Sequence, residues 1–222
     1  MPSLTPREVR KAARAAVTVF DEHGMSCCLF GSLACQIHGM STRDPKDADL
    51  VVLNNRGHDT EGLKQILVDE DERFYLVASR NPDATYQVLY FKLGPRRSCK
   101  VDILTTGNST SLDIPRVPDT RIQYIHPYND LPVMPLLALL LLKLQGWIDH
   151  RHSQKANEQA KVRQDVADVQ EMLKIAVEEE VHINDHESQW MHRWFVERMM
   201  NKVDEYTNQF LGSLSDWESL GL

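Results

Sequence analysis

The chain has 222 residues, 42% of them hydrophobic and 26% charged, which is an ordinary composition for one large globular domain or two small ones. Its formal net charge of −7 argues against broad electrostatic binding to nucleic acid, although a local basic groove is compatible with it. The four cysteines have no metal-binding spacing and are too few for a disulfide scaffold, so we expect a protein of the reducing cytoplasm.

The hydrophobic pattern predicts no membrane association. The longest apolar run, residues 131–142, is shorter than the roughly 20 residues that a crossing helix needs, and Pro132, Pro135 and Lys143 bracket it. We expect a buried core helix there instead. The first residues mix acidic and basic side chains with alanines and lack the apolar core of a signal peptide.

The first part of the chain alternates predicted helices and strands. Thr5 and Glu8 have the spacing of a capping box, which predicts a helix that begins at residue 6 and ends near residue 24. Residues 27–30 predict a short strand, which a glycine–serine turn connects to a helix over 33–38. A second strand over 47–53 and a helix over 60–67 follow.

Antiparallel strands and then helices are predicted for the remainder. Residues 69–73 predict a solvated turn, and residues 121–126 a short edge strand. Three strands are expected over 74–78, 86–93 and 100–104, and four helices over 136–150, 158–179, 185–210 and 213–220. We therefore predict an α/β (α+β) fold with a mixed sheet flanked by helices in residues 1–130, followed by a helical region in residues 131–222.

Two acidic residues at the start of the second strand form the most informative pattern. Asp47 and Asp49 are two residues apart, so on a strand their side chains point to the same face. The apolar residues 50–53 follow directly and predict that the strand is buried. Two carboxylates at the end of a buried strand need a cation, and carboxylate-bound Mg²⁺ is typical of phosphate chemistry. The alternative is a solvated turn that precedes a strand.

A third acid, Asp102, lies within the apolar strand 100–104. A carboxylate there is costly unless it is paired or bound to a metal, and the alternative is an ion pair with Lys100 or a nearby arginine. Asp47, Asp49 and Asp102 on neighbouring strands could hold two metal ions about 4 Å apart. In that arrangement Asp102 would contact only the metal on the attacking side, which makes it the natural general base.

Further candidates could contact phosphate. Gly31 and Ser32 lie in a strand–helix turn, where glycine lets a phosphate approach the backbone and a helix start offers free N–H groups, although most such turns are only turns. Lys143 could reach a triphosphate, or could extend out of an apolar core. Arg43 could bind phosphate, or form a salt bridge with a neighbouring aspartate.

Together these motifs resemble those of the nucleotidyltransferase (polymerase-beta-like) superfamily. The shared pattern is a Gly-Ser turn, an acid-x-acid strand start and a single acid in a later strand. Arg43, four residues before Asp47, completes an Arg-x-x-x-Asp-x-Asp pattern that is similar to that of the AbiEii-like nucleotidyltransferase type. That type also has a helical half with a lysine, which Lys143 matches. Its later motif is similar to Lys161, Asp165 and Asp168.

The resemblance implies an enzyme of the EC 2.7.7 type that transfers a nucleoside monophosphate from an NTP to an acceptor hydroxyl by a two-metal mechanism. It implies Mg²⁺, with Mn²⁺ as an alternative, bound by the three aspartates. The acceptor could be an RNA, a small molecule or a protein, and the sequence predicts no oligomeric state. The alternative is a nucleotide-binding pseudoenzyme or a protein-interaction module on the same fold. Residues 171–222 have no counterpart in the resemblance.

Overall fold

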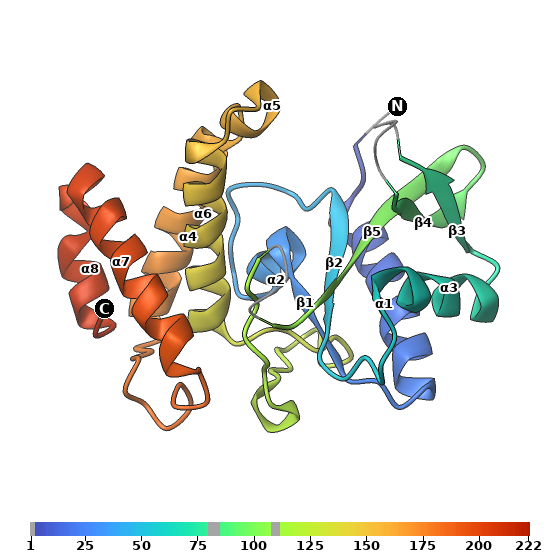
Figure 1. Ribbon diagram of the computed structural model, residues 1–222, viewed down its shortest axis with the longest axis horizontal. Helices are drawn as coiled ribbons and strands as arrows, with labels where there is room; N and C mark the ends of the chain where they lie inside the picture. The colour runs from blue at the N-terminus through green and yellow to red at the C-terminus, as the bar shows by residue number, and fades with distance from the viewer. Residues whose placement is uncertain (1–2, 80–84, 108–111) are drawn as a thin grey trace. The chain divides into compact units, whose positions relative to one another are not determined.

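A mixed sheet of five strands forms the centre of the first part of the chain (Figure 1). The computed structural model describes residues 3–79, 85–107 and 112–222. The strand order across the sheet is β1-β2-β5-β4-β3, in which β2 and β5 run parallel and the other neighbouring pairs run antiparallel. The strands are β1 (Cys27–Phe30), β2 (Asp47–Val52), β3 (Phe74–Ala78), β4 (Gln87–Gly94) and β5 (Arg97–Thr105).

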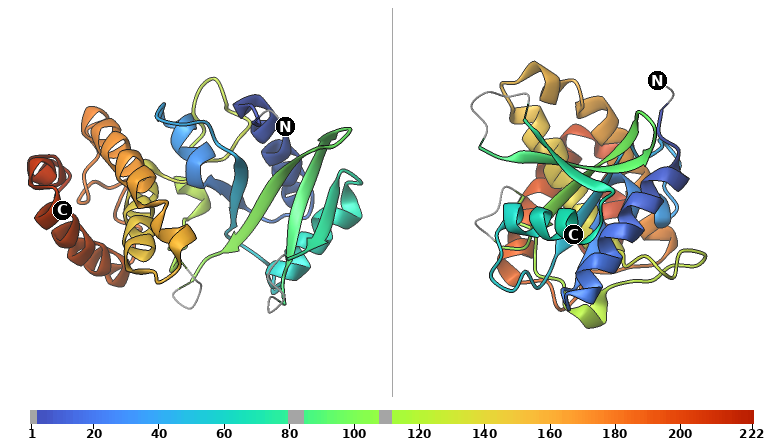
Figure 2. Two further views of the ribbon diagram at one scale, coloured as in Figure 1. Left: turned by 90° about the horizontal axis from the view of Figure 1, so that it is seen from above. Right: turned by 90° about the vertical axis from the view of Figure 1, so that its right-hand side faces the viewer.

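Two helices, α1 (Pro6–Glu22) and α3 (Thr60–Glu70), lie side by side across one face of this sheet (Figure 2). The predicted capping box begins α1, because the Thr5 hydroxyl accepts a hydrogen bond from the Glu8 N–H and the Glu8 carboxylate accepts one from the Thr5 N–H. The sheet turns its apolar side chains towards the helices, and these are fully or almost fully buried: Ala48, Leu50, Phe74, Leu89, Phe91, Cys99 and Val101. Because side chains alternate along a strand, the aspartates of β2 lie on the opposite face.

A short helix, α2 (Gly31–Ile37), follows β1 without a connecting loop and packs on β1 and β2. It begins two residues earlier than the sequence pattern predicts. Gly31 makes this direct connection possible, because its φ of +66° is a backbone conformation that residues with a side chain rarely adopt.

The chain divides into two compact units. The first comprises Met1–Ile37, Arg43–Thr106 and Ile122–Met134, and the second comprises His38–Thr42, Gly107–Arg121 and Pro135–Leu222. The second unit is helical, and within it α4 packs against α6 and α7. Its elements are η1 (Asp119–Arg121), α4 (Leu136–His152), α5 (Ala156–Gln159), α6 (Val162–Glu178), α7 (Arg193–Gln209), η2 (Leu211–Ser213) and α8 (Leu214–Ser219).

The leucine-rich run becomes the core of the second unit. Nearly every side chain of α4 from Leu136 to Ile148 is buried, so the predicted core helix is confirmed. Trp147 of α4 packs edge-on against Tyr206 of α7, with the ring centroids 4.9 Å apart. Among the helices of the described residues, none is long and apolar enough to cross a membrane.

Two predicted helices are wrong in extent. The helix expected over 158–179 is divided, since α5 ends at Gln159 and α6 begins at Val162. The Ser153 hydroxyl donates to the Glu158 carboxylate and the Gln159 amide donates to the Ser153 carbonyl, which ties α5 to the end of α4. The helix expected over 185–210 begins only at residue 193. The Asp185 carboxylate accepts a hydrogen bond from the His182 N–H, so the residues before Arg193 form turns instead.

Two smaller expectations are also wrong. The turn predicted over 69–73 begins later, because α3 extends through Glu70. The edge strand predicted over 121–126 reduces to a single bridge between Gln123 and Val133, with Arg121 in the short helix η1. Otherwise the order of strands and helices is as predicted, and the mixed α/β fold is confirmed.

Candidate active site

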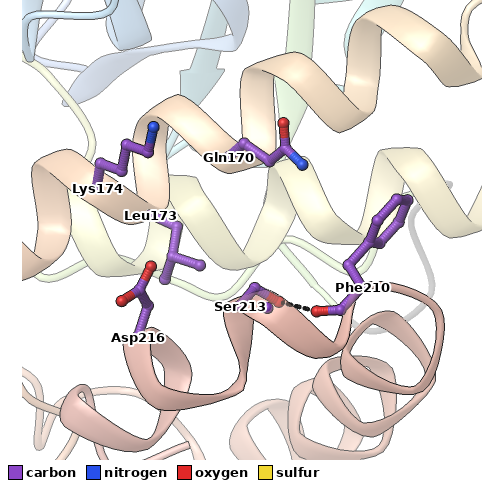
Figure 3. Close-up of a pocket in the computed structure, with 7 residues that line it drawn as sticks. Gln170, Leu173, Lys174, Phe210, Ser213 and Asp216 are labelled. Atoms are coloured by element: carbon purple, nitrogen blue, oxygen red, sulfur yellow. Dashed lines mark hydrogen bonds between the residues drawn. The ribbon is translucent and has the colours of Figure 1, made fainter.

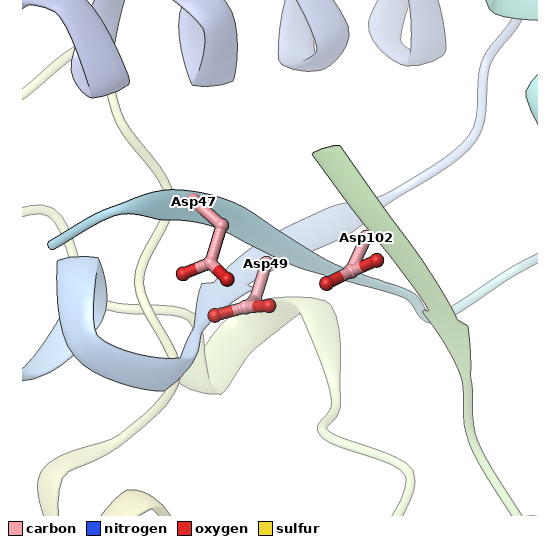
Figure 4. Close-up of side chains that lie close together, drawn as sticks. All are labelled: Asp47, Asp49 and Asp102. Atoms are coloured by element: carbon pink, nitrogen blue, oxygen red, sulfur yellow. The ribbon is translucent and has the colours of Figure 1, made fainter. Parts of the chain in front are cut away.

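Three carboxylates meet on the face of the sheet that faces away from α1 and α3 (Figure 4). Asp47 and Asp49 lie two residues apart on β2, and the parallel register places Asp49 directly opposite Asp102 of β5. One carboxylate oxygen from each of the three residues lies within 4.8 Å of those of the other two, and all three side chains are partly buried. The structure therefore brings together the three acids that the sequence pattern singled out.

These three carboxylates fit a hard divalent cation. Mg²⁺ binds oxygen ligands at 2.0–2.1 Å, so two ligands of one ion lie at most about 4.2 Å apart. Because the three oxygens all lie within 4.8 Å of one another, small side-chain movements would let them share one ion or flank two. Asp47, Asp49 and Asp102 are thus the residues that could hold a metal.

Gly31 lies directly against the acids. A Cβ atom at this position would be 2.0 Å from a carboxylate oxygen of Asp49, so any side chain there would force that carboxylate to move. The absence of a side chain therefore lets the turn between β1 and α2 pack against Asp49. Ser32 follows in the first turn of α2 and is only 3% exposed. The predicted Gly-Ser turn thus begins beside the predicted acids.

Lys100 is a neighbour of the acids that the sequence pattern offered only as an alternative ion-pair partner of Asp102. It pairs with Asp47 in the register of β2 and β5, and its ammonium forms an ion pair with Asp102. Burial opposes the charged form, but the hydrogen bond to Asp102 and the charges of the three aspartates outweigh it and raise the pKa of Lys100. Lys100 therefore partly neutralises the acid cluster, as the alternative explanation of Asp102 anticipated. The spacing of residues 100 and 102 on one strand is the signal that could have assigned it to the site.

The thiol of Cys99 lies next to Lys100 in the sequence. Cys99 is buried, and burial together with the charge of Asp47 raises the pKa of its thiol to about 12. A thiol with that pKa stays protonated at neutral pH, whereas a nucleophilic cysteine reacts as its thiolate. Cys99 also lies among the apolar side chains that face α1 and α3, so it is not part of the acid cluster.

The other two predicted residues have different surroundings. Arg43 is partly buried in the bend that precedes β2, in the first unit. Lys143 lies on α4 in the second unit, where its ammonium donates to the Asp168 carboxylate at 2.9 Å. Asp168 is fully buried, so this lysine has the partner that its place in a leucine-rich helix requires. The Lys143–Asp168 pair joins α4 to α6, and His150 and Asp165 form a second such pair.

A shallow pocket of about 360 Å³ lies in the second unit, where α6 faces η2 and α8 (Figure 3). It contains none of the residues that the sequence pattern singled out. Its lining residues come from α6 and from the end of the chain: Gln170, Leu173, Lys174, Phe210, Gly212, Ser213 and Asp216. Most of them are exposed or partly exposed, so the pocket is an open surface depression rather than an enclosed site.

The architecture that carries the acids is shared with a known protein. An antigenic nucleotidyltransferase-like protein from Paracoccidioides brasiliensis matches 98% of this chain over 95% of its own length, with a TM-score of 0.67 and 14% sequence identity. The chain has a nucleotidyltransferase-like fold. At 14% identity, this likeness concerns the nucleotidyltransferase-like fold and not the substrate.

A weaker likeness extends to ANT(2")-Ia, solved in complex with adenylyl-2"-tobramycin. It matches 78% of this chain and 94% of its own, with a TM-score of 0.43 and 12% identity. No protein-family model and no curated protein matches the sequence. The predicted nucleotidyltransferase-type fold is thus confirmed from structure, and the AbiEii-like subtype stays a prediction.

Proposed function

We propose that this protein is a metal-dependent nucleotidyltransferase that moves a nucleoside monophosphate from an NTP to an acceptor hydroxyl. The observation that carries the proposal is the convergence of Asp47, Asp49 and Asp102 beside Gly31, on a nucleotidyltransferase-like fold. Three carboxylates so close together repel one another, and a cation that also binds phosphate relieves that repulsion.

Each acid has a role in the proposed two-metal mechanism. Asp47 and Asp49 would hold the metal, Mg²⁺ or alternatively Mn²⁺, with Asp102 as a further ligand. Bound metal supplies Lewis acidity, which favours the deprotonated acceptor and offsets charge on the phosphates. Asp102 takes the proton of the acceptor hydroxyl. The hydroxyl oxygen then bonds to the α-phosphorus of the NTP, and the bond from that phosphorus to pyrophosphate breaks.

The remaining candidate residues bind the donor in this proposal. Gly31 and Ser32 contact the phosphates, because the turn adjoins Asp49 and carries no side chain at its first position. Arg43 and Lys143 contribute positive charge to the triphosphate. We assign catalysis to a core of residues 1–130 and a supporting role to the helical region 131–222. The four free, buried cysteines support the cytoplasmic setting that we propose.

A second candidate function follows from the ion pair between Lys100 and Asp102. If this pair is permanent, Asp102 cannot accept a proton, and the protein binds nucleotides or a partner protein without catalysis. Release of pyrophosphate in the presence of an acceptor distinguishes the two functions, because only the transferase releases it.

The test is a transfer assay with α-labelled NTPs and a panel of RNA, small-molecule and protein acceptors. We expect Asp102→Asn to lower the rate by at least about a hundredfold, the usual contribution of a general base. Asp44→Asn is the matched control, since Asp44 is exposed and lies outside the acid cluster. Full activity in Asp102→Asn would exclude its role as the base. Binding of metal and NTP without pyrophosphate release by the wild type would favour the pseudoenzyme.

A further inference from the structure

The face of the sheet that carries the acids continues beyond them with two tyrosines, of which Tyr75 is exposed and Tyr90 is partly buried. In the strand registers, Lys100 of β5 lies opposite Tyr90 of β4, and Tyr90 lies opposite Tyr75 of β3. These three residues therefore form one row across the sheet, which starts at the strand that holds Asp102. We call Tyr75, Tyr90 and the flanking Lys92 the tyrosine platform.

The rings of the platform are held in place. The ring centroids of Tyr75 and Tyr90 are 5.8 Å apart, and their planes are inclined by only 22°. The Tyr75 hydroxyl lies 2.7 Å from the Ser98 hydroxyl of β5, which anchors the outer ring across the sheet. Because the rings are ordered in this way, a ligand that stacks on them loses little free energy to arranging them.

The platform is accessible although it is aromatic. Tyr75 is 37% exposed, and Val77, one row further along β3, is 42% exposed. The equivalent positions on the opposite face, Phe74 and Phe91, are 2% exposed or less. An ordinary soluble sheet has one buried and one polar face, so exposed aromatic and apolar residues beside an acid cluster indicate a binding surface.

Distance connects the platform to the acids. Neighbouring strands lie about 5 Å apart, so Tyr90 is about 5 Å and Tyr75 about 10 Å from the backbone of β5. A ligand of the size of one nucleotide, stacked on Tyr90, would extend to the Asp102 carboxylate. The platform is therefore within reach of the position where the proposed reaction needs an acceptor hydroxyl.

The charge of the platform indicates which class of ligand it suits. On this face, the residues of β3 and β4 named above are tyrosine, valine and lysine, and β5 adds Ser98 and Lys100 before Asp102 is reached. Lys92 is exposed and lies opposite Ser98. A lysine beside stacked aromatic rings suits a planar ring with an attached anion, whereas a polycationic acceptor would gain nothing from Lys92.

We infer that the tyrosine platform is the acceptor subsite and that the acceptor is a nucleotide-like group, which presents a base to Tyr75 and Tyr90, a phosphate to Lys92 and a sugar hydroxyl to Asp102. The inference rests on the proposed function, since it uses the acids as the reacting centre. The same chemistry belongs to a free nucleotide and to the end of a single strand.

Fluorescence anisotropy with a labelled single-stranded octaribonucleotide tests this subsite. The titration is done in EDTA, so that metal-dependent donor binding does not contribute. Unlabelled AMP and CMP are then used as competitors. Displacement by the mononucleotides at concentrations close to the octamer Kd indicates a free nucleotide as the source. A much tighter octamer indicates a strand end.

We expect Tyr75→Ala and Tyr90→Ala each to weaken octamer binding at least about fivefold, the loss of one base–aromatic stack. Tyr90→Phe keeps the ring and should bind as the wild type does. Tyr124→Ala is the matched control, because Tyr124 is 58% exposed and outside the platform strands. Calorimetry of Mn²⁺–NTP binding is run on every variant and should be unchanged, which also establishes that the variants are folded.

Two results would overturn the inference: equal octamer binding by Tyr75→Ala, Tyr90→Ala and the wild type, or no binding of octamer or mononucleotide by the wild type. If Mn²⁺–NTP binding is intact in either case, only the acceptor subsite is wrong and the proposed transferase stands. Absence of Mn²⁺–NTP binding in the wild type would overturn the proposed function and, with it, this inference.

Discussion

The acidic residues of the two units differ in how their charge is balanced. In the helical unit, the buried acid Asp168 has its own cation, Lys143, and a second hydrogen bond from the Gln164 amide. In the sheet unit, three carboxylates share one small region, where Lys100 forms an ion pair with Asp102. Balanced charge holds helices together, whereas a concentration of like charge is costly for folding and indicates a site for a cation.

This difference assigns separate purposes to residues that look alike in the sequence. Asp102 and Asp168 are both acids that lie among buried apolar residues, and each has a lysine partner. Asp168 is fully buried, while the Asp102 side chain is 35% exposed and lies beside two further carboxylates. The surroundings, rather than the residue type, therefore distinguish the acid that supports the fold from the acid of the proposed metal site.

The largest expected effect comes from breaking the balanced pair. Lys143→Met removes the ammonium from a carboxylate that has no exposed surface, so we expect a loss of about 3–5 kcal/mol in the free energy of unfolding. Lys143→Met/Asp168→Leu removes both charges and should recover most of that loss. Urea denaturation measures both variants, with Lys174→Met, an exposed lysine on α6, as the control.

The double variant also separates the two roles of Lys143. If this lysine binds the triphosphate as proposed, the refolded double variant is stable but binds NTP more weakly than the wild type. Unchanged NTP affinity in the double variant would limit Lys143 to a structural role.

In the sheet unit, a substitution at Gly31 tests whether Asp49 belongs to a metal site. We expect Gly31→Ala to strain the left-handed backbone by roughly 1–2 kcal/mol and to push the Asp49 carboxylate away from its neighbours. Metal affinity should therefore fall more than stability does. Gly146→Ala is the control, since Gly146 lies within α4 and an added Cβ there meets no atom within 4 Å. Equal Mn²⁺ affinity in Gly31→Ala and the wild type would contradict a site at Asp49.

The features that depend on local sequence patterns were predictable, and those that depend on contacts between distant segments were not. The apolar run after Asp49 and the alternation in β4 and β5 are local, so the strands and their faces were predictable. The convergence of Asp102 with Asp49 depends on parallel pairing of β2 with β5, which follows only if the family resemblance is accepted. The pairing of Lys143 with Asp168 depends on the packing of α4 on α6, which no local pattern shows.

Replacement of Lys100 should have a smaller effect on metal affinity, and it should raise the affinity instead of lowering it. The ammonium competes with a metal for Asp102, so Lys100→Met should raise Mn²⁺ affinity. The increase is up to about fivefold, because a partly exposed ion pair contributes about 1 kcal/mol or less. Calorimetric titration of Mn²⁺ measures it, with Lys92→Met as the control on the same face. A weaker affinity in Lys100→Met would mean that the lysine organises the acids instead of competing for them.

The smallest effect concerns a paired acid of the sheet unit. Hydrogen bonds from Arg97 and from Thr5 lower the pKa of Glu8 from 4.5 to about 2. A carboxylate with a lowered pKa in the folded state stabilises fully above its unfolded value, and this contribution is lost as the pH falls from about 4.5 towards 2. Glu8→Gln should therefore flatten the dependence of Tm on pH in that window and leave metal binding unchanged. An identical pH profile would mean that the pair with Arg97 does not stabilise the fold.

The central claim is that the crowded acids form a metal–nucleotide site. Calorimetric titration of each NTP, with Mg²⁺ and with EDTA, into the wild type, Asp47→Asn/Asp49→Asn and the Asp44→Asn control tests it most directly. We predict binding that requires the metal, persists in Asp44→Asn and is lost in the double variant, whose circular dichroism stays that of the wild type. Equal binding by the double variant, or no binding of any NTP by the wild type with Mg²⁺, would contradict the account.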